Sequence, residues 1–163
     1  MLQWPFRDKI VEEVSEDLLQ PGDHVKCDCT KIKWLSWLVS YEHHAIYMGN
    51  GRYIQNTLGK DTDGKYIKIE DVNAFFKNAP IKKMRKVQHN NCLYSAKEIL
   101  QRAKEFREKY GHRIYCLPIN NCEYFISMVY YNHYFSKQVL NVLIQLLLGG
   151  LLIASIVYFV KFI

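Results

Sequence analysis

Residues 117–126 read LPINNCEYFI, and the rest of the chain is organised around this stretch. A proline and two asparagines end the segment before it, and apolar residues then recur at the spacing of one helical face. The short amide of Asn120 or Asn121 suits the N-cap of that helix, because it can accept from the free amides of the first turn. Cys122 is therefore expected in the first turn, where unpaired amides and the helix dipole favour a thiolate. This placement suits a nucleophile, although a buried structural cysteine is the commoner role.

A thiol nucleophile needs a base, and two adjacent histidines precede a short apolar strand. His43 and His44 come before Ala45–Met48, and residues 49–51 (GNG) then predict a turn. Neighbours on a strand point to opposite faces, so only one of the two imidazoles faces the thiol. Strand alternation alone leaves open which of them is the base.

These two stretches together resemble the lecithin retinol acyltransferase-like family, a permuted branch of the papain-like thiol enzymes. Residues 43–51 read HHAIYMGNG and residues 121–125 read NCEYF. The family pattern is a strand that begins His-aromatic-(Ala/Gly)-Ile-Tyr, then Gly-Asp-Gly, and later Asn-Cys-Glu-His-Phe. The resemblance covers Leu19–Asn132 and is closest to the small phospholipase A/acyltransferase subfamily, the H-Ras-like suppressor group. It implies an α+β fold in which an antiparallel sheet packs on helices, within a catalytic domain of residues 19–136.

The resemblance also implies the roles of individual residues. Cys122 stands at the nucleophile that forms an acyl-thioester, and His43 stands at the general base. Many members carry a second histidine twelve residues after the first, to orient the base, and here that position is Gln55. An amide can still accept a hydrogen bond from the imidazole, although it brings no titratable group. Tyr124 likewise replaces a histidine of the family pattern.

Composition sets broader limits. A chain of 163 residues accommodates one domain and a tail, and its net charge of +6 suits anionic membranes or nucleic acid. No nucleic-acid motif accompanies the charge, so we expect no nucleic-acid partner. Five cysteines without metal-ligand spacing predict no metal, no cofactor and a reducing compartment. Residues 1–18 are expected to be a loose or short helical lead without a signal peptide, and His24 is expected on the surface of a strand.

The C-terminal segment has the features of a membrane anchor. Residues 138–160 contain no charged side chain over 23 positions. As a helix, this segment measures about 35 Å, enough for a hydrocarbon core of roughly 30 Å. We therefore expect a single-pass transmembrane tail anchor that leaves the catalytic domain in the cytosol. Residues 34–39 (WLSWLV) are either core or a loop that enters the membrane interface, and the basic strand at residues 81–87 suits acidic headgroups.

The leading hypothesis is a membrane-anchored phospholipase A1/A2 and phospholipid-dependent N- or O-acyltransferase. Membrane phospholipids are the substrates, and an amine, a hydroxyl or water is the acyl acceptor. The second hypothesis is an inactive membrane adaptor, in which Gln55 and Tyr124 mark an eroded site. A peptidase, which the wider papain-like fold permits, is disfavoured by the hydrophobic tail.

Overall fold

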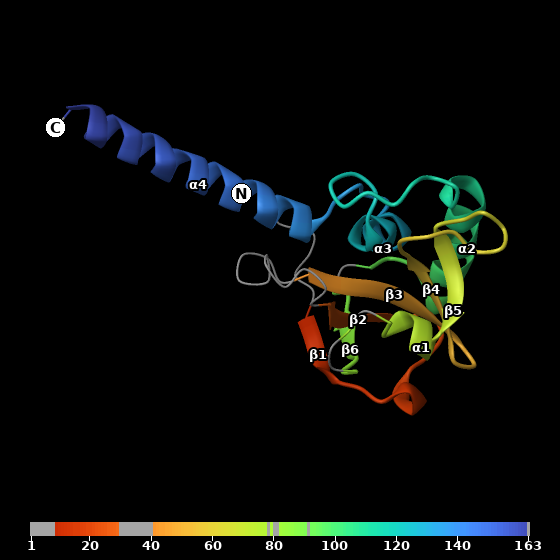
Figure 1. Cartoon of the computed structure of the whole chain (residues 1–163). Coiled ribbons are helices and arrows are strands. Elements are labelled where there is room, and N and C mark those ends of the chain that lie inside the picture. The colour runs from red at the N-terminus through yellow and green to blue at the C-terminus, as the bar shows by residue number, and fades with distance from the viewer. Residues whose placement is uncertain (1–8, 30–40, 78, 80–81, 91, 163) are drawn as a thin grey trace.

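A single antiparallel sheet with helices on both of its faces forms the body of the protein (Figure 1). The computed structural model describes residues 9–29, 41–77, 79, 82–90 and 92–162. The six strands lie in the order β1-β6-β2-β3-β4-β5, and every neighbouring pair is antiparallel. The strands are β1 (Lys9–Glu13), β2 (His24–Cys29), β3 (Tyr41–Gly49), β4 (Arg52–Asn56), β5 (Ile67–Asp71) and β6 (Arg85–Gln88). The helices are α1 (Val72–Phe75), α2 (Ala96–Tyr110), α3 (Cys122–Tyr131) and α4 (Lys137–Phe162), with a 3-10 turn at Glu16–Leu18.

Alternation along β3 divides the core into two layers. Ala45 and Tyr47 belong to a cluster with α1 on one face of the sheet. Ile46, on the opposite face, belongs to a second cluster with α2 and α3, in which Phe125 is 1% exposed. The expected α+β architecture, an antiparallel sheet packed on helices, is confirmed.

Two helices begin at residues whose side chains cap the first turn. Asn121 is the N-cap of α3, and its side chain accepts from the amide of Tyr124 at 2.9 Å. Ser95 and Glu98 form a reciprocal capping box at the start of α2, which leaves fewer free amides in the first turn. The GNG turn between β3 and β4 is also present, with Asn50 and Gly51 both at positive φ (51° and 69°).

Two predictions from local sequence are wrong. The lead at residues 1–18 contains a strand, β1, because its backbone pairs with the edge of β6, a partner more than 70 residues away. Residues 113–116, where the sequence predicts a strand before the nucleophile, contain none; Cys116 alone makes a bridge with Asn120, across a turn at residues 117–119. The stretch at residues 34–39 lies outside the described residues.

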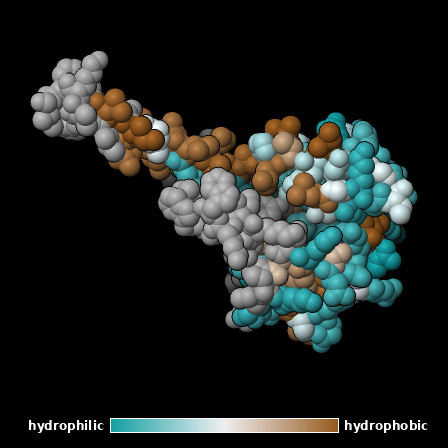
Figure 2. Space-filling view, in the orientation of Figure 1, coloured by the Kyte–Doolittle hydropathy of each residue, from teal (hydrophilic) through white to brown (hydrophobic). Residues whose placement is uncertain are grey.

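Helix α4 projects away from the domain, and its described surface is largely apolar (Figures 1 and 2). Leu146, Leu147 and Ile153 are each more than half exposed. Within the part of the chain that the structure describes, however, no helix is both long and apolar enough to cross a membrane. The predicted transmembrane span at residues 138–160 therefore gains no support.

Candidate active site

Cys122 is the first residue of α3 and is fully buried. The turn before it is held by Asn121, whose side-chain nitrogen Nδ2 donates to the main-chain carbonyl of Leu117 at 2.8 Å. The thiol of Cys122 lies 3.6 Å from the main-chain oxygen of Glu42 on β3. A helix N-terminus with a capped first turn is an environment that stabilises a thiolate.

His43 and Gln55 form a hydrogen bond between β3 and β4. The Nε2 atom of His43 lies 2.8 Å from Oε1 of Gln55, and Gln55 Nε2 in turn donates to Oε2 of Glu70 at 2.7 Å. Because a carbonyl oxygen only accepts, Nε2 of His43 carries the proton and Nδ1 carries the lone pair. Gln55 thus fixes the imidazole tautomer, the role proposed for the family histidine that it replaces.

Burial keeps His43 in its neutral, basic form. Desolvation lowers the pKa of His43, and the hydrogen bond from the ring to Gln55 and the charge of Glu70 partly oppose this change. A neutral imidazole with a free lone pair is the form that a general base requires.

The structure brings Cys122, His43 and Gln55 to the same end of the sheet. Strands β3 and β4 pair from Gly49 opposite Arg52 to Ile46 opposite Ile54, and His43 and Gln55 lie just beyond this ladder. At the same place, the side chain of Asn56 donates to the main-chain oxygen of Asn121 at 3.2 Å, which attaches the start of α3 to the end of β4.

Cys27 lies close to both the Cys122 thiol and His43. It lies directly opposite His43 in the β2–β3 ladder, and Cys122 is one of the groups that act electrostatically on its thiol. A hydrogen bond with Cys29, followed by burial, raises the pKa of Cys27 far above its usual range. A thiol held in its protonated form is a poor nucleophile, so Cys122 remains the better candidate.

Gln138 is a site residue that the sequence reading missed. Its side-chain nitrogen donates at 2.8 Å to the main-chain oxygen of Glu42, the same atom that the Cys122 thiol contacts. Its main-chain amide donates to Oε2 of Glu123 at 2.8 Å, and its Oε1 is buried without a partner. A lone polar residue at the start of an apolar run was the signal, but it was read as the edge of a membrane span.

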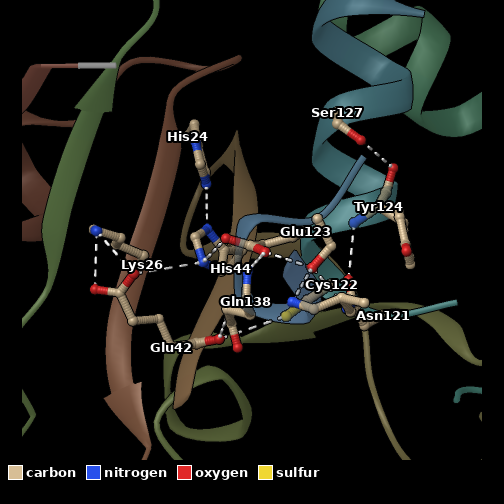
Figure 3. A network of polar contacts seen from close by, with 12 residues as sticks. His24, Lys26, Glu42, His44, Asn121, Cys122, Glu123, Tyr124, Ser127 and Gln138 are labelled. Atoms are coloured by element: carbon tan, nitrogen blue, oxygen red, sulfur yellow. Dashed lines mark hydrogen bonds and ion pairs between the residues drawn. The ribbon is translucent and has the colours of Figure 1, made fainter. Parts of the chain in front are cut away.

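His44 lies on the opposite face of β3 from His43, as alternation predicted. Its Nδ1 is 2.8 Å from Nε2 of His24, and its ring points toward Glu42 and Glu123 (Figure 3). His24 is only 3% exposed, so its prediction as a surface residue is wrong. Alternation of β2 alone does not reveal that both neighbouring strands and α3 cover this position.

Comparison with protein families decides the relationship. The family model described as lecithin retinol acyltransferase matches residues 17–135, which is most of the chain. The chain belongs to the lecithin retinol acyltransferase family. A comparison with curated proteins finds no similar sequence. Lecithin retinol acyltransferase-like proteins are thiol acyltransferases and hydrolases that act on lipids, so an activity of this general type follows.

The described residues offer no obvious metal site in this family domain. No group of three or more His, Cys, Asp or Glu side chains in the described ranges is arranged to hold a metal ion.

Proposed function

We propose that this protein is a phospholipase A1/A2 and phospholipid-dependent N- or O-acyltransferase that works through an acyl-thioester on Cys122. The observation that carries the proposal is the bond between His43 and Gln55 at the sheet end where α3 begins with Cys122. His43 Nδ1 takes the thiol proton, and the sulfur attacks the ester carbonyl of a phospholipid. The carbon–oxygen bond breaks, the lysophospholipid oxygen takes the proton, and the acyl group stays on the sulfur. Water, a hydroxyl or an amine then receives the acyl group.

Two donors are available for the oxyanion of the tetrahedral intermediate. The main-chain amide of Cys122 is in the first turn of α3, where helix amides have no intrahelical acceptor. The side-chain nitrogen of Gln138 shares the carbonyl of Glu42 with the Cys122 thiol and is therefore close to the reacting sulfur. Loss of one such donor typically lowers kcat by about 10²–10³-fold.

Helix α4 is the element that we propose for membrane attachment. Its exposed leucine, isoleucine and valine side chains have 46–68% of their surface exposed, and burying their apolar surface in lipid is favourable at about 25 cal/mol per Å². The proposed location is a membrane surface with the catalytic domain in the cytosol.

Intact-protein mass spectrometry tests the chemistry. The full-length protein is incubated with a phospholipid of defined acyl chains, and a mass increase of one acyl group is expected on Cys122. Cys122→Ser should abolish the labile thioester and lysophospholipid release, whereas the matched variant Cys116→Ser should retain both.

Either of two results would count against the proposal. An adduct that persists in Cys122→Ser would place the nucleophile elsewhere. Folded wild-type protein that never acquires an acyl group would instead favour the membrane-adaptor hypothesis.

A further inference from the structure

Four large apolar side chains are exposed on the loop before α3 and on the segment between α3 and α4. They are Ile114, Leu117, Ile119 and Tyr134, with 41–71% of their surface exposed, and we call these four side chains the loop patch. Figure 2 shows hydrophobic side chains on the surface between the base of α4 and α2, where Figure 1 places this loop. Exposed apolar side chains that gather on one surface of a folded domain are typical of a binding surface.

Hydrogen bonds within the protein hold the loop patch in place. The Tyr134 hydroxyl donates to the main-chain oxygen of Ile119, and the Tyr134 ring stacks on that of Tyr124 with the ring centroids 4.4 Å apart. The Tyr124 hydroxyl donates to the main-chain oxygen of Pro118 at 3.0 Å. The loop therefore turns main-chain oxygens toward the protein and leaves its apolar side chains outside, so their exposure is part of the fold.

The loop patch adjoins both the proposed nucleophile and α4. Asn121 Nδ2 donates to the main-chain oxygen of Leu117 at 2.8 Å and to the hydroxyl of Ser136 at 3.0 Å. Asn121 also caps α3 directly before Cys122, and Ser136 directly precedes α4. One side chain thus attaches the loop to the start of both helices, and the patch lies beside the apolar surface of α4.

The charges around the patch favour an anionic partner. Residues 109–121 contain Lys109 and Arg113 but no aspartate or glutamate, and residues 124–163 contain no aspartate or glutamate either. Arg113 is exposed, and it is close enough to Tyr134 to act electrostatically on the phenol. A bilayer with anionic headgroups offers apolar surface to the patch and negative charge to its basic rim.

We propose that the loop patch inserts into the surface of an anionic phospholipid bilayer, with Arg113 among the lipid phosphates. The inference rests on the proposed function and extends it, because it assigns part of the membrane contact to the catalytic domain itself. Tyr134 suits the headgroup level, since its ring is apolar and its hydroxyl is polar. Ile119 and Leu117 would lie deeper, where burial of their apolar surface is favourable.

Immersion of the patch is measured by NMR, without any need for catalysis. Full-length protein with ¹³C-labelled isoleucine and leucine methyl groups is placed in bicelles of ether-linked phosphatidylglycerol and phosphatidylcholine, which cannot be hydrolysed. A nitroxide-labelled lipid then broadens the signals of methyl groups that touch the bilayer. The Ile119 signal, assigned through Ile119→Val, should lose most of its intensity.

Leu18 provides the matched control within the same sample. It is 66% exposed, close to the 63% of Ile119, but it belongs to the 3-10 turn that follows β1. Its neighbour Glu16 lies beside Gly51, in the turn at the far end of β3 from His43. The Leu18 signal should therefore keep its intensity, while the exposed leucines of α4 report separately whether that helix is in lipid.

A charge variant tests the basic rim. Arg113→Gln should lower the relaxation enhancement of the Ile119 methyl group severalfold, because a cation near an anionic surface contributes to binding. Lys97→Gln, an exposed lysine at the start of α2, should leave the enhancement unchanged. Replacing all phosphatidylglycerol by phosphatidylcholine should reproduce the effect of Arg113→Gln in the parent protein.

Two results would overturn the proposal. An Ile119 signal no more broadened than that of Leu18 would show that the patch stays in water, whether or not the leucines of α4 are broadened. Self-association in sedimentation that Ile119→Glu abolishes, without broadening of Ile119, would show that a second copy of the chain covers the patch. Neither result depends on the acyl-thioester chemistry, which the mass-spectrometric experiment tests separately.

Discussion

At the scale of single residues, Gln55 determines how the candidate base works. It accepts from His43 and donates to Glu70, so one neutral amide connects the imidazole with a carboxylate. An imidazole–amide pair orients the ring, and the carboxylate of Glu70 contributes negative charge near it. The pH at which His43 becomes protonated is therefore sensitive to Glu70.

Glu70→Gln should shift the acid limb of the pH–rate profile to lower pH. Burial already lowers the pKa of His43, and the negative charge of Glu70 partly restores it. Removing that charge lowers the pKa further, so the free base and the activity persist to more acidic pH. The measurement is kcat/KM for phospholipid hydrolysis across pH, with Glu105→Gln as the control. An acid limb that moves upward would contradict the assignment of His43.

The sequence anticipated the local part of this site and missed the long-range part. Alternation separated His43 from His44, and the asparagine before Cys122 indicated a helix cap. His24 contacts His44, which is 20 positions away in sequence, and His89, which is 65 positions away. No local sequence pattern encodes such contacts. For the same reason the tertiary environment of His24 was predicted wrongly.

At the scale of elements, α4 belongs to the candidate site as well as to the tail. Ser136 and Gln138 both donate to Oε2 of Glu123, at 2.6 and 2.8 Å. The sequence suggested a clean division between a catalytic domain ending at residue 136 and a separate tail. That division would remove Gln138 from the carbonyl of Glu42.

Two truncations separate these roles. A chain ending at Asn141 should keep hydrolysis of detergent-dispersed phospholipid, because the contacts of Gln138 are retained. A chain ending at Ser136 should lose about 10²–10³-fold in kcat, the usual effect of losing one oxyanion donor.

Both truncated proteins should leave the membrane fraction of cells that express them, since each lacks most of the apolar surface of α4. Full activity in the chain ending at Ser136 would exclude a role for Gln138. Retention of the chain ending at Asn141 on membranes would exclude α4 as the attachment.

At the scale of the whole molecule, a chain of three histidines and a tyrosine connects four parts of the fold. His24 lies on β2, His44 on β3 and His89 just after β6, and Tyr131 ends α3. The cationic neighbours Lys26 and Arg85 and the carboxylates of Glu42 and Glu123 surround these rings. The free energy of unfolding should therefore depend on pH through this group.

Stability should be highest above about pH 6.5, the ordinary histidine pKa, and should fall as the pH decreases below it. His24 and His44 have lowered pKa values in the folded protein, so the unfolded chain takes up protons first and is favoured by acid. Burial raises the pKa of Glu123, whose protonation in the folded state opposes this loss at still lower pH.

Urea unfolding at a series of pH values between 8 and 5 measures how the free energy of unfolding changes with pH. His24→Gln should flatten this dependence, whereas His112→Gln, an exposed position, should leave it unchanged. A stability that does not change over this range would show that the rings are not held neutral.

The bonds from Ser136 and Gln138 to Glu123 have a mechanical consequence. They hold the first turn of α4 against the first turn of α3, so α4 is connected to the domain by hydrogen bonds as well as by the chain. An enzyme joined to its anchor by a flexible linker samples many orientations relative to a bilayer, whereas one joined by hydrogen bonds keeps a fixed orientation. With α4 in lipid, Cys122 would therefore be held at one distance from the bilayer and at one orientation to it. A force on α4 would reach the main-chain carbonyl of Glu42, which the Cys122 thiol contacts, through Gln138.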